Sequence, residues 1–383
     1  MIGYGRQTIE EIDIQEVVKT LNSDWLTQGP KIEEFEVDLA EYCGAKYSVV
    51  VSSGTAALHL ANLAMGTKIG DKVITSPISF LASSNSVVYV GGIPIFADIC
   101  KSSFNVDPAE IRKQIKKHPE TKGIIPIHFA GLVTDIEAIY DIAKQNNLWI
   151  IEDACHSFGG NWSDSNGAEH RVGDCTFSDM TIFSFHPVKH ITTGEGGAIL
   201  TNNKNLYEKL LILRNHGITK KPEKLMENHG GWYYELHELG FNYRITAFQA
   251  ALGIQQLKKS YSWQKKRRNI VAYYDEAFKS LETITPQIHP DKGSYSYHLY
   301  VVQAENRKEL YNYLRTKEIY TQVHYIPIHL QPFYKRNFNY NNGDYPIAEQ
   351  YYEKALSLPL YPSLSEEKHD FVIESIFDFY GKS

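Results

Sequence analysis

The sequence lacks the features that mark several large protein classes. It has only four cysteines in 383 residues and no Cys-x-x-Cys pair, so neither a zinc ribbon nor a redox dithiol is indicated. No apolar run approaches the roughly 18 residues of a membrane-spanning helix, and the N-terminus has no basic segment followed by an apolar stretch. We therefore expect a cytoplasmic protein without a membrane span.

An excess of positive charge is missing as well. The formal net charge is −6, and the one basic run, 265–268, is short. Because nucleic-acid binding depends largely on clustered Lys and Arg, we expect no nucleic-acid partner and interpret this run as a solvated helix face. Aromatic residues, by contrast, are plentiful. They fit both core packing and stacking on flat ligands, and composition does not separate the two.

Short β-branched runs alternate with helical patterns in the first part of the chain. The runs predict strands at 46–51, 72–75, 93–96, 123–128, 148–152, 180–185 and 198–201, with helices at 55–65, 82–90 and 135–145. Several of these strands are almost wholly apolar, which is typical of strands covered on both faces. The alternation predicts an α/β domain built on a mostly parallel sheet.

The pattern changes after residue 246. One long helix is predicted from 247 to 261 and beyond, followed by a smaller region with strands at 298–302 and 321–324. We place the boundary inside the long helix, which gives a large domain over 1–255 and a small C-terminal domain over 256–383. No Gly/Ser/Pro-rich linker separates them, so tight packing is expected.

Residues 52–57 (SSGTAA) fall where a predicted strand ends and a predicted helix begins. Such a junction presents backbone N–H groups and the positive end of the helix dipole, which together bind phosphate. Ser and Thr also cap helices that bind nothing. The local pattern leaves both interpretations open.

Asp153, in the segment WIIEDA (149–154), directly follows the predicted buried strand 148–152. Ligands of open α/β sheets bind beyond the carboxyl ends of such strands. A carboxylate there could pair with the protonated ring nitrogen that makes pyridoxal phosphate an electron sink. It could equally cap the segment that follows.

Lys189 stands between the predicted strand 180–185 and a Gly-rich turn. A lysine that loses its hydration becomes nucleophilic and can form a Schiff base with an aldehyde, although most lysines simply face solvent. Pyridoxal phosphate (PLP) needs a phosphate cradle, an acid for its ring nitrogen and a lysine for its aldehyde. The sequence offers these three in that order.

Eight segments, in order, resemble the DegT/DnrJ/EryC1/StrS family of sugar aminotransferases over nearly the whole chain. They are DWLTQGP (24–30), VSSGTAALHLA (51–61), TSPISFLASSN (75–85), EDACHSFGG (152–160), SFHPVKHITTGEGGAILTN (184–202), GFNYRITAFQAALGIQQL (240–257), QVHYIPIHLQPFY (322–334) and LSLPLYPSL (356–364). The resemblance implies PLP as cofactor and the α/β PLP-dependent aminotransferase fold (fold type I, aspartate aminotransferase-like). That fold has a large domain with a mostly parallel mixed sheet and a smaller α+β C-terminal domain.

The resemblance also implies roles for individual residues. Lys189 would be the catalytic Schiff-base lysine, and Asp153 would pair with the pyridine nitrogen. The remaining cofactor-binding residues would be Gly54, Thr55 and Ser184 at the phosphate, Phe80 on the ring face, His156 near the phenolic oxygen, and Asn242 from the other subunit of a homodimer with shared active sites.

The sugar nucleotide would be bound by Tyr4, Asp24, Trp25, Leu26, Thr27, His324 and Tyr325, together with Gly54, Ser184 and Asn242. His324 and His329 could also suggest a metal pair. Because no third ligand stands at a plausible spacing, no metal is expected.

Within the family, four of these segments most resemble enzymes that aminate a UDP-4-keto-6-deoxy-N-acetylhexosamine at C4, with glutamate as donor. The expected product is UDP-4-amino-4,6-dideoxy-N-acetyl-β-L-altrosamine for pseudaminic acid biosynthesis. One alternative is an aminotransferase for a dTDP- or GDP-linked keto sugar.

Two further alternatives concern the chemistry. A PLP-dependent sugar dehydratase would carry histidine at the lysine position, and His190 follows Lys189 here. The fixed spacing from Ser184 and from Glu195 argues against a one-residue slip. A binding-only regulator would lack the lysine or the acid, and both are present.

Overall fold

The computed structural model describes residues 1–288 and 293–381. A seven-stranded sheet forms the centre of the large domain, in the order β2-β10-β9-β6-β5-β3-β4. Its strands are β2 (Tyr47–Val51), β3 (Lys72–Thr75), β4 (Ile93–Phe96), β5 (Gly123–Ile125), β6 (Trp149–Asp153), β9 (Met180–Ser184) and β10 (Gly197–Thr201). Only β10 runs antiparallel to its neighbours, β2 and β9. The predicted mostly parallel sheet is therefore confirmed.

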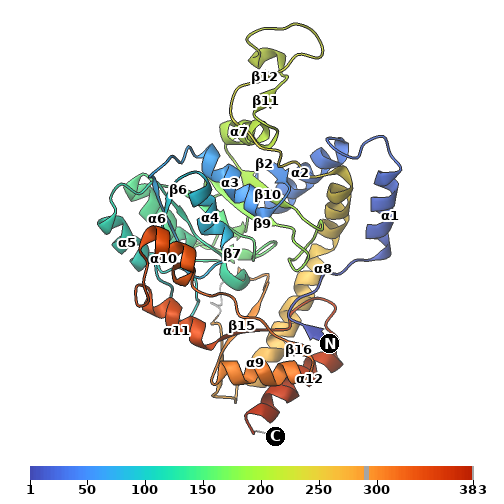
Figure 1. Ribbon diagram of the computed structural model, residues 1–383. Helices are drawn as coiled ribbons and strands as arrows, with labels where there is room; N and C mark the ends of the chain where they lie inside the picture. Colours follow the sequence, from blue (N-terminus) through green and yellow to red (C-terminus); the bar gives the residue numbers. More distant parts are fainter. Residues whose placement is uncertain (289–292, 382–383) are drawn as a thin grey trace.

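Helices cover both faces of this sheet (Figure 1). They are α2 (Pro30–Cys43), α3 (Gly54–Ala64), α4 (Ala82–Tyr89), α5 (Pro108–Lys117), α6 (Ile136–Asn146) and α7 (Lys204–Arg214). The helix α1 (Glu11–Leu21) instead packs on the long helix described next. Strand β2 shows why its sequence is continuously apolar. Val49 and Val51 pack with residues of α3, whereas Val50 packs with Phe35 and Leu39 of α2 on the other side.

The long helix α8 (Ala247–Phe278) connects the two parts of the molecule (Figure 1). It begins with a capping box in which Thr246 and Gln249 satisfy each other's backbone N–H groups. Its first turns pack on α1 and α2, and its last turns supply Tyr274 and Phe278 to the core of the C-terminal region. Residue 255 lies inside this helix, so the division at that point stays a prediction.

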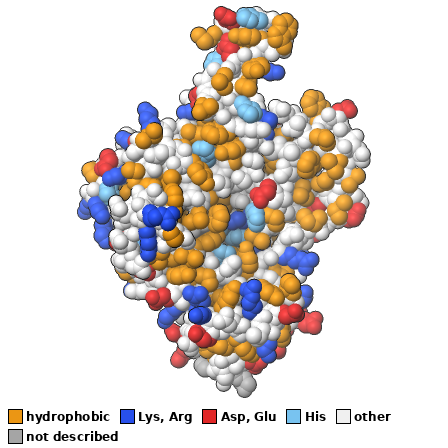
Figure 2. Space-filling view, in the orientation of Figure 1, with side chains coloured by type: hydrophobic (Ala, Val, Ile, Leu, Met, Phe, Trp, Pro, Cys, Tyr) orange, Lys and Arg blue, Asp and Glu red, His pale blue; other side chains and the backbone are white. Residues whose placement is uncertain are grey.

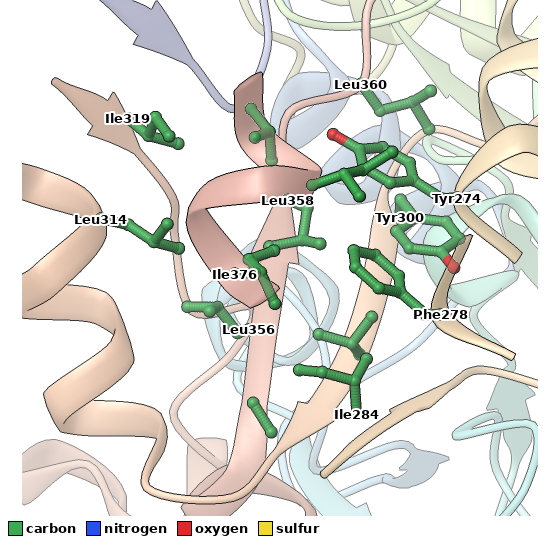
Figure 3. Packing of buried hydrophobic residues seen from close by; sticks show 14 of the residues in the cluster. Tyr274, Phe278, Ile284, Tyr300, Leu314, Ile319, Leu356, Leu358, Leu360 and Ile376 are labelled. Carbon is green, nitrogen blue, oxygen red and sulfur yellow. The ribbon is translucent and has the colours of Figure 1, made fainter. Parts of the chain in front are cut away.

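The C-terminal region is built around an antiparallel sheet of order β13-β15-β17 and the apolar cluster drawn in Figure 3. Its elements are β13 (Ile284–Pro286), β15 (Tyr300–Ala304), β16 (Ile319–Tyr320), β17 (Ala355–Leu358), α9 (Arg307–Thr316), α10 (Pro332–Phe338), α11 (Pro346–Lys354) and α12 (Glu366–Phe379). The N-terminal strand β1 (Ile2–Gly3) pairs in parallel with β16. The first residues therefore pack on this region although they belong to the predicted large domain.

The predicted strand at 321–324 is wrong. The strand β16 ends at Tyr320, and only a single bridge follows, between Gln322 and Ser357. The backbone carbonyl of His324 accepts a hydrogen bond from the Tyr351 hydroxyl (2.5 Å) and is not used in a ladder. The bridge to Ser357 of β17 and side-chain contacts to His324 together hold this segment at the cavity described below.

Two smaller sheets complete the fold. One, of order β14-β7-β8, joins β7 (Asn161–Ser163) and β8 (Glu169–Arg171) to β14 (Gly293–Ser294). The other is the hairpin of β11 (Ile218–Thr219) and β12 (Glu235–Leu236), which forms an arm over residues 218–239 that projects from the body (Figures 1 and 2). Short 3-10 turns lie at Phe129–Gly131 (η1), Pro222–Lys224 (η2) and Ile328–Leu330 (η3). Over the described residues, no helix is both long and apolar enough to cross a membrane.

Candidate active site

A cavity of about 580 Å³ lies at the carboxyl ends of β2, β6 and β9, which point the same way and therefore share one sheet edge. Ten of the residues singled out from the sequence line it: Tyr4, Gly54, Thr55, Phe80, Asp153, His156, Ser184, Lys189, His324 and Tyr325. The volume falls in the range of roughly 300–1,000 Å³ that is usual for small-molecule sites.

The phosphate cradle is the junction between β2 and α3. The Ser53 side chain caps the helix by accepting a hydrogen bond from the Ala56 N–H (3.1 Å), so the capping interpretation holds. The N–H groups of Gly54 and Thr55 precede it in the first turn, where a helix has no internal partners, and both residues line the cavity. A Cβ on Gly54 would lie 2.9 Å from the Ser184 Cβ. Glycine is thus required for the close approach of the cradle to β9.

The two neighbouring acids at the end of β6 face opposite sides of the sheet. Glu152 accepts hydrogen bonds from His128 (2.7 Å), Ser178 (2.5 Å) and Thr181 (3.0 Å). Burial raises the pKa of Glu152, but these bonds, His128 first, bring that pKa below its usual value. These three hydrogen bonds occupy the Glu152 carboxylate inside the protein, so we assign it no contact with the cofactor.

Asp153 lines the cavity instead. Its Oδ2 accepts from the Ser83 hydroxyl (2.6 Å) and its Oδ1 accepts more weakly from the Cys155 N–H (3.3 Å). Asp153 thus does cap the following segment, as the second interpretation held. It also presents a carboxylate, only 6% exposed, to the cavity.

Lys189 lies on a tightly held loop. The Lys189 N–H donates to the His186 carbonyl (2.9 Å), and Thr192 and Thr193 both bond to the Phe185 carbonyl (2.9 and 3.0 Å). The small and hydroxyl residues around the lysine therefore fix the loop. Burial lowers the pKa of Lys189, partly opposed by Cys155 and Asp153, so the amine is closer to its nucleophilic neutral form than an exposed lysine.

His190 is placed differently from Lys189. It is 4% exposed and is not among the residues that line the cavity, and its Nε2 donates to the Ser296 carbonyl (3.2 Å). The dehydratase interpretation requires an alignment shifted by one residue, with His190 at the position of the lysine. Because the His190 ring is buried, hydrogen-bonded and outside the cavity lining, the geometry opposes that interpretation.

His156, His324 and Tyr325 form the wall opposite the cradle. The His156 Nδ1 accepts from the Ala130 N–H (3.3 Å), so its Nε2 carries the hydrogen and donates to the Tyr325 hydroxyl (3.2 Å). The His324 Nδ1 contacts the Ser357 hydroxyl (2.8 Å). Burial, then Lys189, lowers the pKa of both histidines, that of His324 to about 3, so both are neutral.

Five of the predicted site residues do not line the cavity that contains the other ten. Asp24, Trp25, Leu26, Thr27 and Asn242 lie outside the cavity lining. Trp25 is 56% exposed and Leu26 47%. The resemblance assigned Asn242 to the other subunit, and the roles of all five stay predictions.

Other lining residues were not assigned a role in the site from the sequence. They include Cys155, Glu195, His298 and Gln322. His298 is the most notable, because its Nε2 lies 3.5 Å from the Lys189 Nζ. It stands 109 residues from Lys189 in an unremarkable polar stretch before β15, so only the tertiary structure reveals it.

These residues fit PLP. The α3 N-terminus has first-turn N–H groups for a phosphate, and the glycine there leaves space that a Cβ would fill. The Asp153 carboxylate and the desolvated Lys189 amine face the same cavity. Metal chemistry has no comparable basis, because the described residues contain no cluster of three or more potential ligands.

Comparison with known proteins supports the same conclusion. The DegT/DnrJ/EryC1/StrS aminotransferase family matches residues 7–377. The chain is 39% identical to the spore coat polysaccharide biosynthesis protein SpsC of Bacillus subtilis, over 98% of this chain and 96% of that protein. It is 35% identical to the UDP-4-amino-4,6-dideoxy-N-acetyl-beta-L-altrosamine transaminase of Campylobacter jejuni, over 100% and 98%.

Among solved structures, the chain is similar to Helicobacter pylori PseC, an aminotransferase involved in the biosynthesis of pseudoaminic acid. The TM-score is 0.90 with 31% sequence identity, over 99% of both chains. The predicted fold and the predicted cofactor are confirmed by these relationships.

Proposed function

Because the chain belongs to the DegT/DnrJ/EryC1/StrS aminotransferase family, we propose that it moves the amino group of glutamate to C4 of a UDP-4-keto-6-deoxy-N-acetylhexosamine. The product would be UDP-4-amino-4,6-dideoxy-N-acetyl-β-L-altrosamine, a precursor of pseudaminic acid. The chain is a PLP-dependent sugar aminotransferase. The choice of sugar, nucleotide and donor is the proposed part.

One observation carries the proposal: Lys189, Asp153 and the N-terminus of α3 meet in one cavity. Bound PLP supplies an aldehyde that condenses with amines and a ring that accepts an electron pair. We assign its phosphate to Gly54, Thr55 and Ser184. Asp153 would keep the ring nitrogen protonated, and the hydrogen bond from Ser83 would fix the orientation of that carboxylate.

Lys189 would act as both base and acid. In the neutral form that burial favours, its Nζ takes the proton from the α-carbon of glutamate, and 2-oxoglutarate is released. When the keto sugar follows, the same amine delivers a proton to sugar C4, so that the amino group ends on that carbon. The loop bonds around Phe185 and His186 hold the amine in place for both proton transfers.

The sugar would lie against Tyr4, His324 and Tyr325, which line the same cavity. Neutral His324 adds no charge beside the substrate. For the residues outside the cavity we propose a homodimer, in which Asn242 and the segment 24–27 complete the site across the interface. The exposed side chains of Trp25, Leu26 and the arm residues Met226, Trp232, Leu236 and Leu239 support such an interface.

The test has two stages. Visible absorption of the PLP-loaded protein is recorded before and after glutamate is added, and the proposal expects the yellow band to be lost as 2-oxoglutarate appears. UDP-, dTDP- and GDP-linked 4-keto-6-deoxy sugars are then offered, with products identified by mass spectrometry and NMR. An amino sugar formed only from a dTDP- or GDP-linked substrate would overturn the choice of nucleotide.

A different sugar is the second candidate. The identity to SpsC, named for spore coat polysaccharide biosynthesis, exceeds that to the altrosamine transaminase. Offering each keto sugar with and without the N-acetyl group separates the two candidates, because equal turnover of the two forms would contradict the preferred one.

A further inference from the structure

A buried histidine from the C-terminal region reaches the amine of the proposed catalytic lysine. His298 is 4% exposed, and its Nε2 lies 3.5 Å from the Lys189 Nζ. It stands at the entry to β15, so this contact joins the small C-terminal core to the loop that follows β9.

The backbone of His298 is clamped from two sides. Its N–H donates to the Ala130 carbonyl in η1 (2.9 Å). On the other side, the buried Arg267 of α8 donates to the carbonyls of Tyr297 (3.3 Å), His298 (3.4 Å) and Leu360 (3.0 Å). A guanidinium that is only 1% exposed is thus used to hold the segment that carries the histidine.

The His298 ring can accept a hydrogen bond from the Lys189 amine through its Nε2. Burial, followed by the electrostatic effects of Lys189, His156, His190 and Arg267, holds the pKa of His298 well below its usual value, so the ring is neutral. Its Nδ1 is buried and has no hydrogen-bond partner in the described parts of the chain, so nothing there forces hydrogen onto Nε2. Both the ammonium and the neutral amine of Lys189 have N–H groups that can donate to a lone pair at that nitrogen.

The other histidines of the site are already engaged. His156 bonds to Ala130 and Tyr325, His190 to the Ser296 carbonyl and His324 to Ser357. Within residues 1–288 and 293–381, His298 is the histidine whose hydrogen-bonding contact is with Lys189.

We propose that His298 is a positioning residue for Lys189. Its Nε2 accepts a hydrogen bond from the lysine amine while that amine is not joined to the cofactor, and so turns the amine's lone pair toward the substrate carbon. This role rests on the proposed function of Lys189 and extends it to the step of proton transfer.

The test compares two amides at position 298. The terminal amide of H298Q reaches about as far as the histidine Nε2 and can accept the same bond, whereas the shorter amide of H298N cannot. H369Q replaces a histidine that is equally buried, far from the cavity in the C-terminal region, and is the matched control. If H298N does not fold, H298L replaces it, since it fills similar volume without an acceptor.

The first measurement is the rate of the half-reaction with α-protonated and α-deuterated glutamate. H298N should slow it by about tenfold or more and raise the deuterium isotope effect, because proton transfer becomes slower than the other steps. The KM for glutamate should stay within about twofold. H298Q should remain within about threefold of the wild type, and H369Q should not differ from it.

The second measurement needs no amino donor. The protein is loaded with pyridoxamine phosphate, which leaves Lys189 free, and labelling of Lys189 by an amine-reactive reagent is followed by peptide mass spectrometry. H298N should be labelled severalfold faster than the wild type and H298Q at the wild-type rate.

Equal labelling of all three proteins, or equal losses in H298N and H298Q with an unchanged isotope effect, overturns the role of His298. A wild type that ignores glutamate but shows the labelling difference would count against the proposed donor alone.

Discussion

The wall of the cavity and the core of the C-terminal region are built on opposite principles. The C-terminal core is aliphatic and aromatic (Figure 3), and the hydroxyls of Tyr274 and Tyr300 bond to the Pro359 carbonyl (3.1 Å) and to Asp275 (2.8 Å). The cavity wall instead holds the desolvated Lys189 and His298, whose Nδ1 atom has no partner among the described residues.

Because of this difference, we expect the C-terminal core to determine stability and the cavity wall to determine the reaction. A buried polar group without a hydrogen-bond partner destabilises the folded state, whereas a packed leucine or phenylalanine side chain stabilises it. The protein therefore tolerates the unpaired Nδ1 of His298 at the cavity, while the C-terminal core supports β15 and the histidine before it. Changes in the wall should affect the reaction and changes in the core should affect stability.

The largest effect is expected for Lys189→Ala. Transamination should fall by at least about 10³-fold, or roughly 4 kcal/mol in the barrier, because the base and acid of both proton transfers is lost. The free energy of unfolding should not fall, since a desolvated amine is removed. Product formation and chemical denaturation measure the two effects. The exposed Lys354→Ala is the control, and activity of K189A within about tenfold of the wild type would contradict the assigned role.

Leu356→Ala should give the converse result. Leu356 is completely buried in the C-terminal core, so its truncation should lower the free energy of unfolding by about 2–5 kcal/mol. The PLP absorption band should be unchanged at temperatures where the variant is folded. Ile69→Ala, at a residue that is 89% exposed, should change stability by less than about 0.5 kcal/mol. Loss of the band in folded L356A would show that core and wall are not separable.

Gly54→Ala tests the cradle. The added Cβ would lie 2.9 Å from the Ser184 Cβ, so one side must shift at a cost of about 1–3 kcal/mol. Titration of the variant with PLP should show binding weakened by about tenfold or more. Gly3→Ala meets only ordinary contacts, with the nearest atom 3.6 Å away, and should bind PLP as the wild type does. Equal affinities would remove the argument for a close-packed cradle.

The smallest effect concerns acid stability. His369 packs on Tyr274 beside the C-terminal core, and burial lowers its pKa to about 4. In the unfolded chain His369 is protonated below about pH 6.5, whereas in the folded chain it is protonated only below about pH 4. The folded state therefore loses stability as the pH falls from about 6.5 to about 4. In H369Q the loss between about pH 8 and pH 5 should be about 1–2 kcal/mol smaller than in the wild type. Identical pH dependence in denaturant titrations would show that His369 does not contribute.

The part of the site that the sequence predicts is the part made locally. The junction of β2 and α3, Asp153 at the end of β6 and Lys189 after β9 each carry a signal within a few residues, because a strand end and the turn after it are encoded together. The strands of the central sheet follow from continuous apolar runs for the same reason. The prediction of a strand at Thr321–His324 failed because the segment pairs with β17 through the single bridge Gln322–Ser357, and His324 is held by the side chains of Tyr351 and Ser357.

The remainder depends on long-range packing. His298 meets Lys189 only because Arg267 and Ala130 clamp its backbone, and no local pattern records that contact. The residues 24–27 and Asn242 lie outside the cavity of this chain. The role predicted for Asn242 requires a second subunit, and we propose that residues 24–27 also act across that interface.

The most direct test of the central claim is to load the protein with PLP, reduce it with borohydride and map the modified peptide by mass spectrometry. The account predicts the reduced cofactor on the Lys189 side chain, and no modification there after prior incubation with glutamate. Modification of another lysine, or no stable modification at all, would contradict the assignment of Lys189 and the mechanism derived from it.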